Sequence, residues 1–247
     1  MSSNHKLFFP PIIAHRGASA LAPENTLAAF RKAREIGAKW VEFDVMLAAC
    51  GEAVVIHDET LERTTNGFGQ VCDYPASYLQ TLDAGSWFAP QFKNEKIPTL
   101  AEVIDFLCQE QLAANIEIKP SIGREEETVK KVLELIEQCW KHDILPPIIS
   151  SFSTKVLYQV RQYSLTSLLA FLMHEWREDW QAECDALNCM SVDVNQMILN
   201  PYNVKEIKDT GRLLLAYTVD DVMRARELWS WGVDAVFTNC PPAMLRV

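Results

Sequence analysis

Short runs of apolar residues alternate with amphipathic helical segments eight times along this chain. The predicted strands are near-continuous apolar runs, which is typical of parallel strands that are covered on both faces. They span residues 11–15, 39–45, 112–119, 146–151, 167–172, 190–194, 212–218 and 233–238. The predicted helices span residues 24–36, 99–110, 124–142, 153–163, 177–187, 201–210 and 220–231, with a short one after Pro241. Eight βα units in 247 residues predict an α/β fold, a (β/α)8 TIM barrel.

Local signals support the helix boundaries. Thr99 and Glu102 have the spacing of a capping box, and Ser153 and Asp220 are predicted N-caps. Three predicted helices end just before a glycine, as helices often do: Gly37, Gly211 and Gly232. An open, doubly wound sheet is the alternative fold, but the first βα turn lacks the G-x-G-x-x-G pattern of a dinucleotide-binding fold.

Residues 46–98 interrupt the alternation. A plain βα connection has only a few residues, so this segment is predicted to be a small subdomain inserted after strand two, with a hairpin around Ala53–His57. The insertion follows the carboxyl end of a barrel strand, where barrel active sites lie. We therefore expect residues 1–247 to form a single barrel domain that carries one inserted subdomain.

Charge and composition limit the partners of the chain. Its net charge of −10 gives no general attraction for nucleic acid or anionic membranes, so an anionic substrate needs a local positive site. The seven cysteines are odd in number and scattered, which favours reduced thiols in a cytoplasmic protein. The amino terminus lacks the pattern of a signal peptide, and no apolar run approaches the roughly 20 residues of a membrane span. Stable membrane association is therefore not expected.

Carboxylates stand at the ends of two predicted strands. Glu42 and Asp44 point to the same side of the second strand because strand side chains alternate, and their neighbours are apolar. Two carboxylates in a medium of low dielectric repel each other, so a shared cation is the favoured interpretation; pairing with Arg or Lys is the alternative. Glu117 on the third strand would be the third ligand. Oxygen ligands suit one divalent cation, Mg²⁺, Ca²⁺ or Mn²⁺.

Basic side chains accompany these carboxylates. His15 ends the first strand, and His57 ends an apolar run in the insertion. Imidazole titrates near neutral pH, so the two histidines are the candidate general acid and base. Arg16 can bind a phosphate through two parallel N–H bonds. Lys119 can also bind a phosphate, and a salt bridge to Glu117 is the alternative for this residue.

Other residues are weaker candidates. Tyr217, at the end of the seventh predicted strand, could pack against a substrate. His174 and Glu175 follow the fifth strand on the same face of the barrel and could contact a substrate as well. His142 stands at a predicted helix end, where a cation suits the helix dipole, and is expected to have a structural role.

The charges of the candidate site fit a phosphodiester. The three carboxylates exceed Arg16 and Lys119 by one negative charge, which would repel an anionic substrate. One divalent cation changes the net charge to about +1. The set therefore indicates metal-assisted cleavage of a phosphoester, with the histidines moving protons.

Six segments together resemble the glycerophosphodiester phosphodiesterase family, in the same order along the chain. They are His15-Arg16-Gly17, Pro23-Glu24-Asn25-Thr26, Glu42-Phe43-Asp44, His57-Asp58, Arg63-Thr64-Thr65-Asn66-Gly67 and Ile116-Glu117-Ile118-Lys119-Pro120. The segments Ala216-Tyr217-Thr218-Val219 and Gly232-Val233-Asp234 to Phe237-Thr238 are also similar, and residues 175–180 resemble the bacterial cytoplasmic member. The chain departs from the family in the hairpin after strand two, where the usual polar turn is replaced by Leu47-Ala48-Ala49-Cys50-Gly51.

The resemblance implies a (β/α)8 barrel that hydrolyses glycerophosphodiesters, which are small molecules, to sn-glycerol 3-phosphate and an alcohol. It implies that Glu42, Asp44 and Glu117 bind the metal. It also implies that His15 and His57 are the acid/base pair, and that Arg16 and Lys119 hold the phosphate. A substrate hydroxyl is expected to attack phosphorus and form a cyclic phosphate that water opens; direct attack by water is the alternative.

Two other functions are less favoured. A phospholipase acting on lysolipid or phosphoinositide headgroups needs an apolar or basic rim, and the acidic charge argues against it. A barrel that binds a metal or ligand without catalysis is disfavoured because both histidines and all three carboxylates are present. The preferred headgroup, the native metal and the oligomeric state are left open by the sequence.

Overall fold

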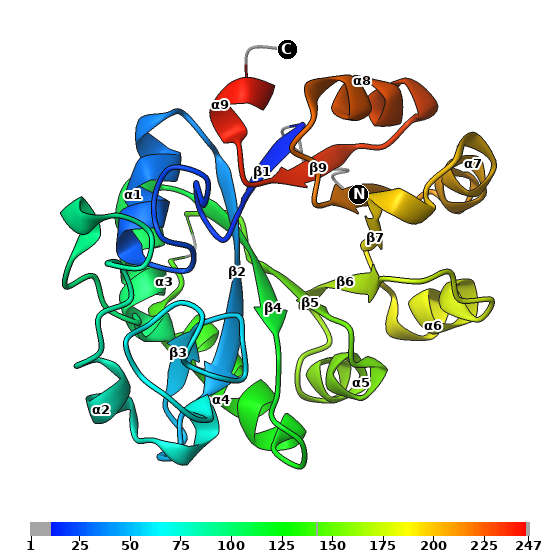
Figure 1. The fold of residues 1–247 in the computed structure, drawn as a ribbon. Coiled ribbons are helices and arrows are strands. Elements are labelled where there is room, and N and C mark those ends of the chain that lie inside the picture. Colours follow the sequence, from blue (N-terminus) through cyan, green and yellow to red (C-terminus); the bar gives the residue numbers. More distant parts are fainter. Residues whose placement is uncertain (1–10, 142, 246–247) are drawn as a thin grey trace.

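Eight parallel strands form a closed barrel with helices outside it in the computed structural model, which describes residues 11–141 and 143–245 (Figure 1). The barrel strands are β1 (Ile12–His15), β2 (Trp40–Leu47), β4 (Ala113–Ile118), β5 (Ile148–Ser151), β6 (Leu168–Met173), β7 (Ser191–Asn195), β8 (Leu213–Tyr217) and β9 (Ala235–Thr238). Neighbours follow the chain order from β4 to β9, and pairing of β1 with both β9 and β2 closes the ring. The predicted (β/α)8 barrel is confirmed, and the open sheet is excluded.

The outer helices agree with the predicted ones in order. They are α1 (Leu27–Glu35), α3 (Leu100–Glu110), α4 (Glu125–Cys139), α5 (Thr154–Tyr163), α6 (Trp180–Leu187), α7 (Pro201–Asp209), α8 (Val222–Trp231) and the short α9 (Pro241–Met244). The capping box of Thr99 and Glu102 is present at the start of α3, and Ser153 caps α5. Both predictions are confirmed. Capping depends only on residues within one turn, so the sequence alone can predict it.

Two helix starts differ from the sequence prediction. The prediction that Asp220 caps α8 is wrong: Asp221 accepts the capping hydrogen bond from the Arg224 backbone N–H. Helix α1 begins three residues later than predicted, after the N-cap Thr26, because Asn25 has a positive φ of 58° that interrupts helical geometry.

Side chains that point into the barrel change character along its axis. An apolar cluster fills its lower part, with Ile13, Trp40, Ala113 and Leu215 among its members. Two residues further along these strands, the side chains that face the barrel interior are polar. They face the interior because side chains i and i+2 of a strand share a face. The barrel interior is therefore apolar below and polar at the carboxyl ends of the strands, where the predicted site residues lie.

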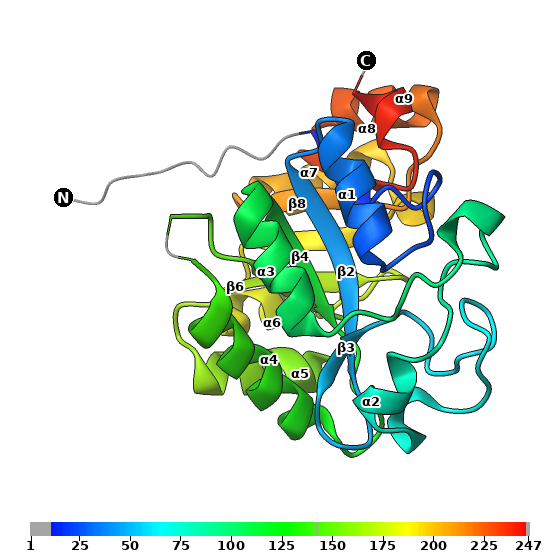
Figure 2. The same cartoon turned by 90° about the vertical axis from the view of Figure 1, so that its left-hand side faces the viewer.

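The segment between β2 and α3 has its own apolar cluster. Strand β3 (Ala53–Val55) pairs antiparallel with β2, which confirms the predicted hairpin. The 3-10 helix η1 (Val71–Asp73), the short α2 (Ala76–Leu79) and the 3-10 helix η2 (Pro90–Phe92) follow. Buried side chains from the hairpin, the loops and α2 pack together here, and Figure 2 shows the segment in cyan and teal grouped at one end of β2. The division into one domain with residues 46–98 as an inserted subdomain stays a prediction.

Several other sequence predictions concern the whole chain. In residues 11–141 and 143–245, no helix is both long and apolar enough to cross a membrane. The seven cysteines are free. His142 and the amino-terminal segment before Pro11 lie outside the described residues.

Gly17 offers a test of how tightly the first βα turn packs. Its φ is +80°, and a Cβ there would lie 2.7 Å from the backbone carbon of Ala29 in α1. Gly37 has a similar φ of +91° but no heavy atom within 4 Å of a built Cβ. We expect Gly37→Ala to lower the free energy of unfolding by about 1–2 kcal/mol, and Gly17→Ala to lower it by roughly 1–3 kcal/mol more through the clash. Urea denaturation measures both, and equal losses would contradict the packing described.

Candidate active site

Strand register brings the predicted acidic residues and His15 together. In the parallel pairs, His15 of β1 is opposite Glu42 of β2, and Asp44 of β2 is opposite Glu117 of β4. Paired residues on neighbouring parallel strands point to the same face, and Glu42 and Asp44 share that face because they are two residues apart. All four side chains therefore meet inside the barrel at the carboxyl ends of three adjacent strands.

The three carboxylates form a compact cluster. One oxygen from each of Glu42, Asp44 and Glu117 lies within 4.8 Å of the others. Glu42 and Asp44 are buried, and Glu117 is partly buried. The Asn25 amide donates to Asp44 Oδ2 at 2.9 Å, whereas Glu117 Oε1 is buried with no hydrogen-bond partner among the described residues. A buried acceptor without a donor is costly, and a cation beside it removes that cost.

The pKa values of the cluster lead to the same conclusion. Burial, together with the Asp44 charge, raises the pKa of Glu117 to about 8 and holds the pKa of Glu42 well above its usual range. A divalent cation provides the opposite charge that three adjacent carboxylates lack. The donor set, three carboxylates without thiolate or imidazole, suits a hard cation bound through oxygen. These residues therefore fit a divalent cation.

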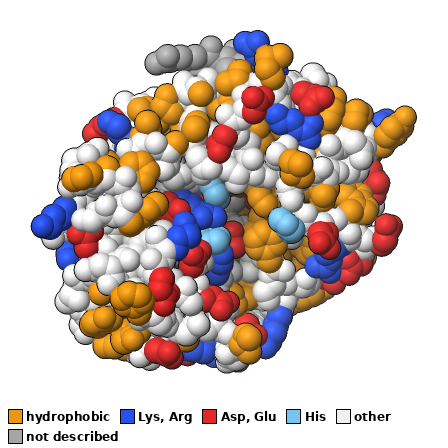
Figure 3. Space-filling view, viewed as in Figure 1, with side chains coloured by type: hydrophobic (Ala, Val, Ile, Leu, Met, Phe, Trp, Pro, Cys, Tyr) orange, Lys and Arg blue, Asp and Glu red, His pale blue; other side chains and the backbone are white. Residues whose placement is uncertain are grey.

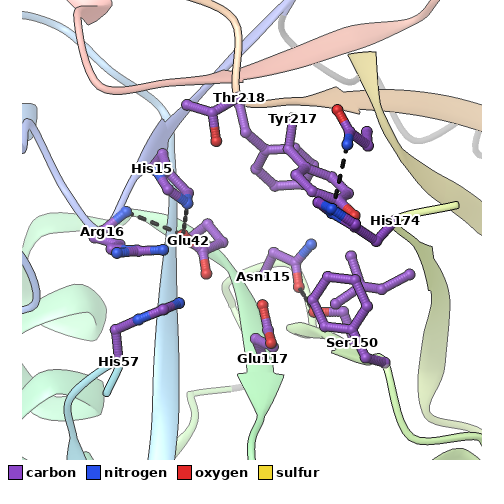
Figure 4. Close-up of a pocket in the computed structure, with 14 residues that line it drawn as sticks. His15, Arg16, Glu42, His57, Asn115, Glu117, Ser150, His174, Tyr217 and Thr218 are labelled. Atoms are coloured by element: carbon purple, nitrogen blue, oxygen red, sulfur yellow. Dashed lines mark hydrogen bonds and ion pairs between the residues drawn. The ribbon is translucent and has the colours of Figure 1, made fainter. Parts of the chain in front are cut away.

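His57 follows β3 in the inserted segment and lies on the same side of the pocket as His15 and Arg16 (Figure 4). It is oriented by its sequence neighbour. Its Nδ1 lies 2.5 Å from Asp58 Oδ1. A carboxylate can only accept, so Nδ1 carries the proton and Nε2 is left free. Asp58 is itself held by Arg63, which donates to both of its oxygens.

His15 is oriented differently. Its Nδ1 lies 2.7 Å from the amide Oδ1 of Asn239, and its Nε2 lies 3.8 Å from Glu42 Oε2. Burial, with a smaller contribution from the Arg16 charge, lowers the pKa of His15 to about 4. Burial also lowers the pKa of His57. Both imidazoles are therefore neutral at neutral pH in this environment, each with one nitrogen directed away from its orienting partner.

The two predicted phosphate-binding cations contact the acidic cluster. Arg16 Nε lies 3.4 Å from Asp44 Oδ2, its Nη1 donates to Glu24 Oε1 at 2.9 Å, and its backbone N–H donates to Glu42. Lys119 Nζ lies 3.8 Å from Asp44 Oδ1, so its ion pair is with Asp44 and the predicted alternative pairing with Glu117 is wrong. Lys119 follows the last residue of β4, and its backbone N–H donates to the Val45 carbonyl, which continues the pairing of β4 with β2 by one residue.

Arg63 and Glu24 extend this arrangement, and the sequence analysis assigned neither a role. Arg63 donates to both oxygens of Glu24, and Glu24 also accepts from Arg16. A continuous chain of ion pairs therefore runs from Arg16 to His57 through Glu24, Arg63 and Asp58. The segments that contain these residues resemble the family, but Glu24 and Arg63 are 39 residues apart and only the fold pairs them.

The pocket has two chemically different sides. It has a volume of about 370 Å³. In Figure 3 charged and histidine side chains border one side of the hollow and hydrophobic side chains border the other. Figure 4 shows His15, Arg16, Glu42 and His57 facing Tyr217, His174 and Ser150 across the space. The apolar side is lined by Phe152, Leu172, Tyr217 and Phe237.

The weaker candidates lie on this second side. Tyr217 ends β8 as predicted, packs edge-to-face with Phe152 at 6.0 Å, and has a buried hydroxyl without a hydrogen-bond partner among the described residues. His174 lines the pocket and its Nδ1 lies 3.4 Å from the Asn195 amide nitrogen, whereas Glu175 does not line the pocket. Contact of Tyr217 or His174 with a substrate stays a prediction.

The comparisons with known proteins agree with this geometry. The profile of the glycerophosphoryl diester phosphodiesterase family matches residues 15–243. The chain is 36% identical over 245 residues to a glycerophosphodiester phosphodiesterase of Caldanaerobacter subterraneus subsp. tengcongensis, with 96% of each chain covered. It is 33% identical over 259 residues to a glycerophosphodiester phosphodiesterase of Bacillus subtilis, with 95% of this chain and 85% of that protein covered.

A solved structure gives the same result for the fold. An Oleispira antarctica phosphodiesterase, in complex with the product sn-glycerol-3-phosphate, superimposes with a TM-score of 0.94 and 38% sequence identity, covering 97% of this chain and 96% of that one. The resemblance seen in the sequence motifs and the phosphodiesterase assignment are confirmed. The chain therefore belongs to the glycerophosphoryl diester phosphodiesterase family.

Proposed function

We propose that this protein hydrolyses glycerophosphodiesters to sn-glycerol 3-phosphate and an alcohol, with a divalent cation at Glu42, Asp44 and Glu117 and with His15 and His57 as the acid/base pair. The carboxylate cluster carries this proposal: one oxygen from each of its three residues lies within 4.8 Å of the others, and Glu42 and Glu117 line the same pocket as both histidines. Mg²⁺ and Ca²⁺ both suit the oxygen ligands, and Mn²⁺ would also fit.

The charge of the site supports the need for a cation. Five carboxylates, those of Glu24, Glu42, Asp44, Asp58 and Glu117, lie in the ion-pair network or the cluster. Three cations, Arg16, Arg63 and Lys119, oppose them. With all five carboxylates ionised, two negative charges remain, and they would repel a phosphodiester. When bound, a divalent cation neutralises this excess and lowers the pKa of an oxygen that it contacts.

The two histidines can move the protons of the reaction. One imidazole removes the proton from a substrate hydroxyl, whose oxygen bonds to phosphorus as the bond to the leaving alcohol breaks. The other imidazole, in its protonated form, gives its proton to the departing oxygen. Water then opens the cyclic phosphate with the two roles reversed. Direct attack by water on the diester is the alternative route. Arg16 and Lys119 hold the phosphate in both.

A phospholipase that acts on lysolipid is the second candidate. Exposed apolar side chains lie in loops or helix starts that follow barrel strands, on the same face as the pocket: Ile122, Phe152, Met197, Tyr202 and Met223. Such side chains could contact a lipid surface. The net charge of −10 still argues against anionic membranes. A cytoplasmic location and the lack of a nucleic-acid partner stay predictions, as does the absence of stable membrane association.

Turnover of defined substrates tests the function. We expect release of sn-glycerol 3-phosphate from soluble glycerophosphocholine, glycerophosphoethanolamine or glycerophosphoglycerol, loss of this release in EDTA, and recovery on adding Mg²⁺ or Ca²⁺. Glu117→Gln should abolish the recovery, whereas the matched Glu134→Gln on the exposed face of α4 should retain it. Turnover of lysolipid vesicles without turnover of the soluble diesters would favour the second candidate instead.

Replacement of either histidine tests the proton transfers. We expect His15→Ala and His57→Ala each to lower kcat by roughly 10²–10⁴-fold. The melting temperature should change little, because neither imidazole belongs to the apolar core. Steady-state kinetics and thermal denaturation measure the two effects, and near-normal turnover by either variant would remove that histidine from the mechanism.

The pKa of Glu117 predicts how cation binding depends on pH. Because burial raises this pKa from 4.5 to about 8, the folded protein without a cation holds a proton that the unfolded chain has lost in this range. The free energy of unfolding therefore falls as the pH rises from 4.5 to about 8. A divalent cation replaces that proton, so Mg²⁺ should raise the melting temperature more at about pH 9 than at about pH 6. Equal increases at both pH values, measured by calorimetry, would contradict this expectation.

A further inference from the structure

The residue that orients His15 lies at the other end of the chain. Asn239 directly follows β9, and its Oδ1 lies 2.7 Å from His15 Nδ1. The pocket is lined by His15 but not by Asn239, so the amide lies behind the imidazole, away from the space a substrate would occupy. The sequence analysis did not single out Asn239, and none of the proton transfers described above uses it.

Asp220 fixes which way the Asn239 amide points. Asn239 Nδ2 donates to Asp220 Oδ2 at 2.8 Å, and the Asn239 backbone N–H donates to Asp220 Oδ1 at 2.7 Å. A carboxylate accepts hydrogen bonds and cannot donate, so the opposite amide orientation would place two acceptors against each other. The Asn239 oxygen must therefore face His15. This contact is what Asp220 makes in place of the helix cap predicted for it.

The amide oxygen in turn fixes the tautomer of His15. An amide oxygen only accepts, so His15 Nδ1 must carry the proton, and neutral imidazole then has its lone pair on Nε2. Nε2 is the nitrogen on the Glu42 side, 3.8 Å from Glu42 Oε2. The other tautomer would point an N–H at the acidic cluster and leave no lone pair there to accept a proton.

Further hydrogen bonds hold Asn239 against the first βα turn. The Ala20 backbone N–H donates to the Asn239 carbonyl at 3.0 Å, and Ser19 Oγ lies 2.8 Å from Asn239 Oδ1. Thr238 Oγ1 donates to Asp220 Oδ1 at 3.0 Å. The loops after β1, β8 and β9 therefore meet at this one amide, and its position is set by all three.

We propose that Asn239 and Asp220 are positioning residues for the reaction: Asp220 orients the Asn239 amide, which holds His15 with its proton on Nδ1 and its Nε2 lone pair directed into the pocket. This inference rests on the proposed function only in taking His15 as an acid/base residue. It differs from the arrangement at His57, where an adjacent carboxylate performs the same task directly.

An exchange of the two side chains tests the proposal. Asn239→Leu removes the acceptor, and we expect kcat to fall roughly 10- to 100-fold with KM little changed, because a misplaced proton acceptor slows the chemical step. The double variant Asp220→Asn/Asn239→Asp reverses the pair. The new carboxylate at position 239 can accept from His15 Nδ1 and from the new amide at position 220, so kcat should recover at least tenfold relative to Asn239→Leu.

Asn203→Leu is the matched control. Asn203 makes comparable hydrogen bonds at the start of α7, to Ile198 and Asn200, and touches neither histidine. It should lower the melting temperature but leave kcat unchanged. The proposal is overturned if Asn239→Leu keeps kcat within about twofold of the wild type, or if the double variant regains thermal stability without regaining kcat.

The tautomer itself can be observed without turnover. In ¹⁵N-histidine-labelled protein at neutral pH, the His15 resonances should show protonated Nδ1 in the wild type and a shift of the proton toward Nε2 in Asn239→Leu. Wild-type resonances with the proton on Nε2 would overturn the proposal. Because this spectrum does not depend on catalysis, a protein that fails to hydrolyse glycerophosphodiesters but shows the Nδ1–H form contradicts the proposed function and not this inference.

Discussion

Repulsion among Glu42, Asp44 and Glu117 is the constraint that the other residues of the site must compensate. Three carboxylates on two adjacent strands, with Glu42 and Asp44 buried, are unfavourable unless positive charge or donors compensate them. The protein supplies part of that compensation through Arg16, Lys119 and the Asn25 amide. The proposed divalent cation would bring the remainder. The same charge deficit supports the proposal that the cluster binds a hard cation, which would in turn attract a phosphate.

The charged residues of the site are distributed unevenly around the carboxyl end of the barrel. Strands β1, β2 and β4 carry the acidic cluster and His15, and the insertion adds His57 from the side. Barrel enzymes often bind phosphate at the loops after the last two strands. Here the last loop instead supplies Asn239, which contacts His15 from behind. The loop after β5 and strands β6, β8 and β9 supply the apolar side of the pocket. Charged side chains therefore lie on one side of the pocket and apolar side chains on the other.

The two histidines are oriented in different ways, one by a residue next to it in the chain and the other by a residue distant in the chain. His57 is oriented by the next residue in the chain, so a short motif contains both partners. His15 is oriented by a residue 224 positions away, which becomes its neighbour only because β9 pairs with β1 when the barrel closes. Closure of the barrel therefore helps to position His15, the proposed acid/base residue. The ion pairs from Arg16 to His57 connect the insertion to the same end of the barrel.

Features that depend on local pattern could be predicted from the chain alone: the eight alternating units, the capping box at Thr99, and the placement of Glu42 and Asp44 on one strand face. Periodicity and side-chain alternation act within a few residues, so they can be read directly from the chain. Three contacts became known only from the folded arrangement: Lys119 pairs with Asp44, Asp220 holds Asn239 rather than capping a helix, and Arg63 joins Glu24 to Asp58. Those contacts join segments far apart in the chain, and their partners are selected by strand register and barrel closure, for which no local pattern exists.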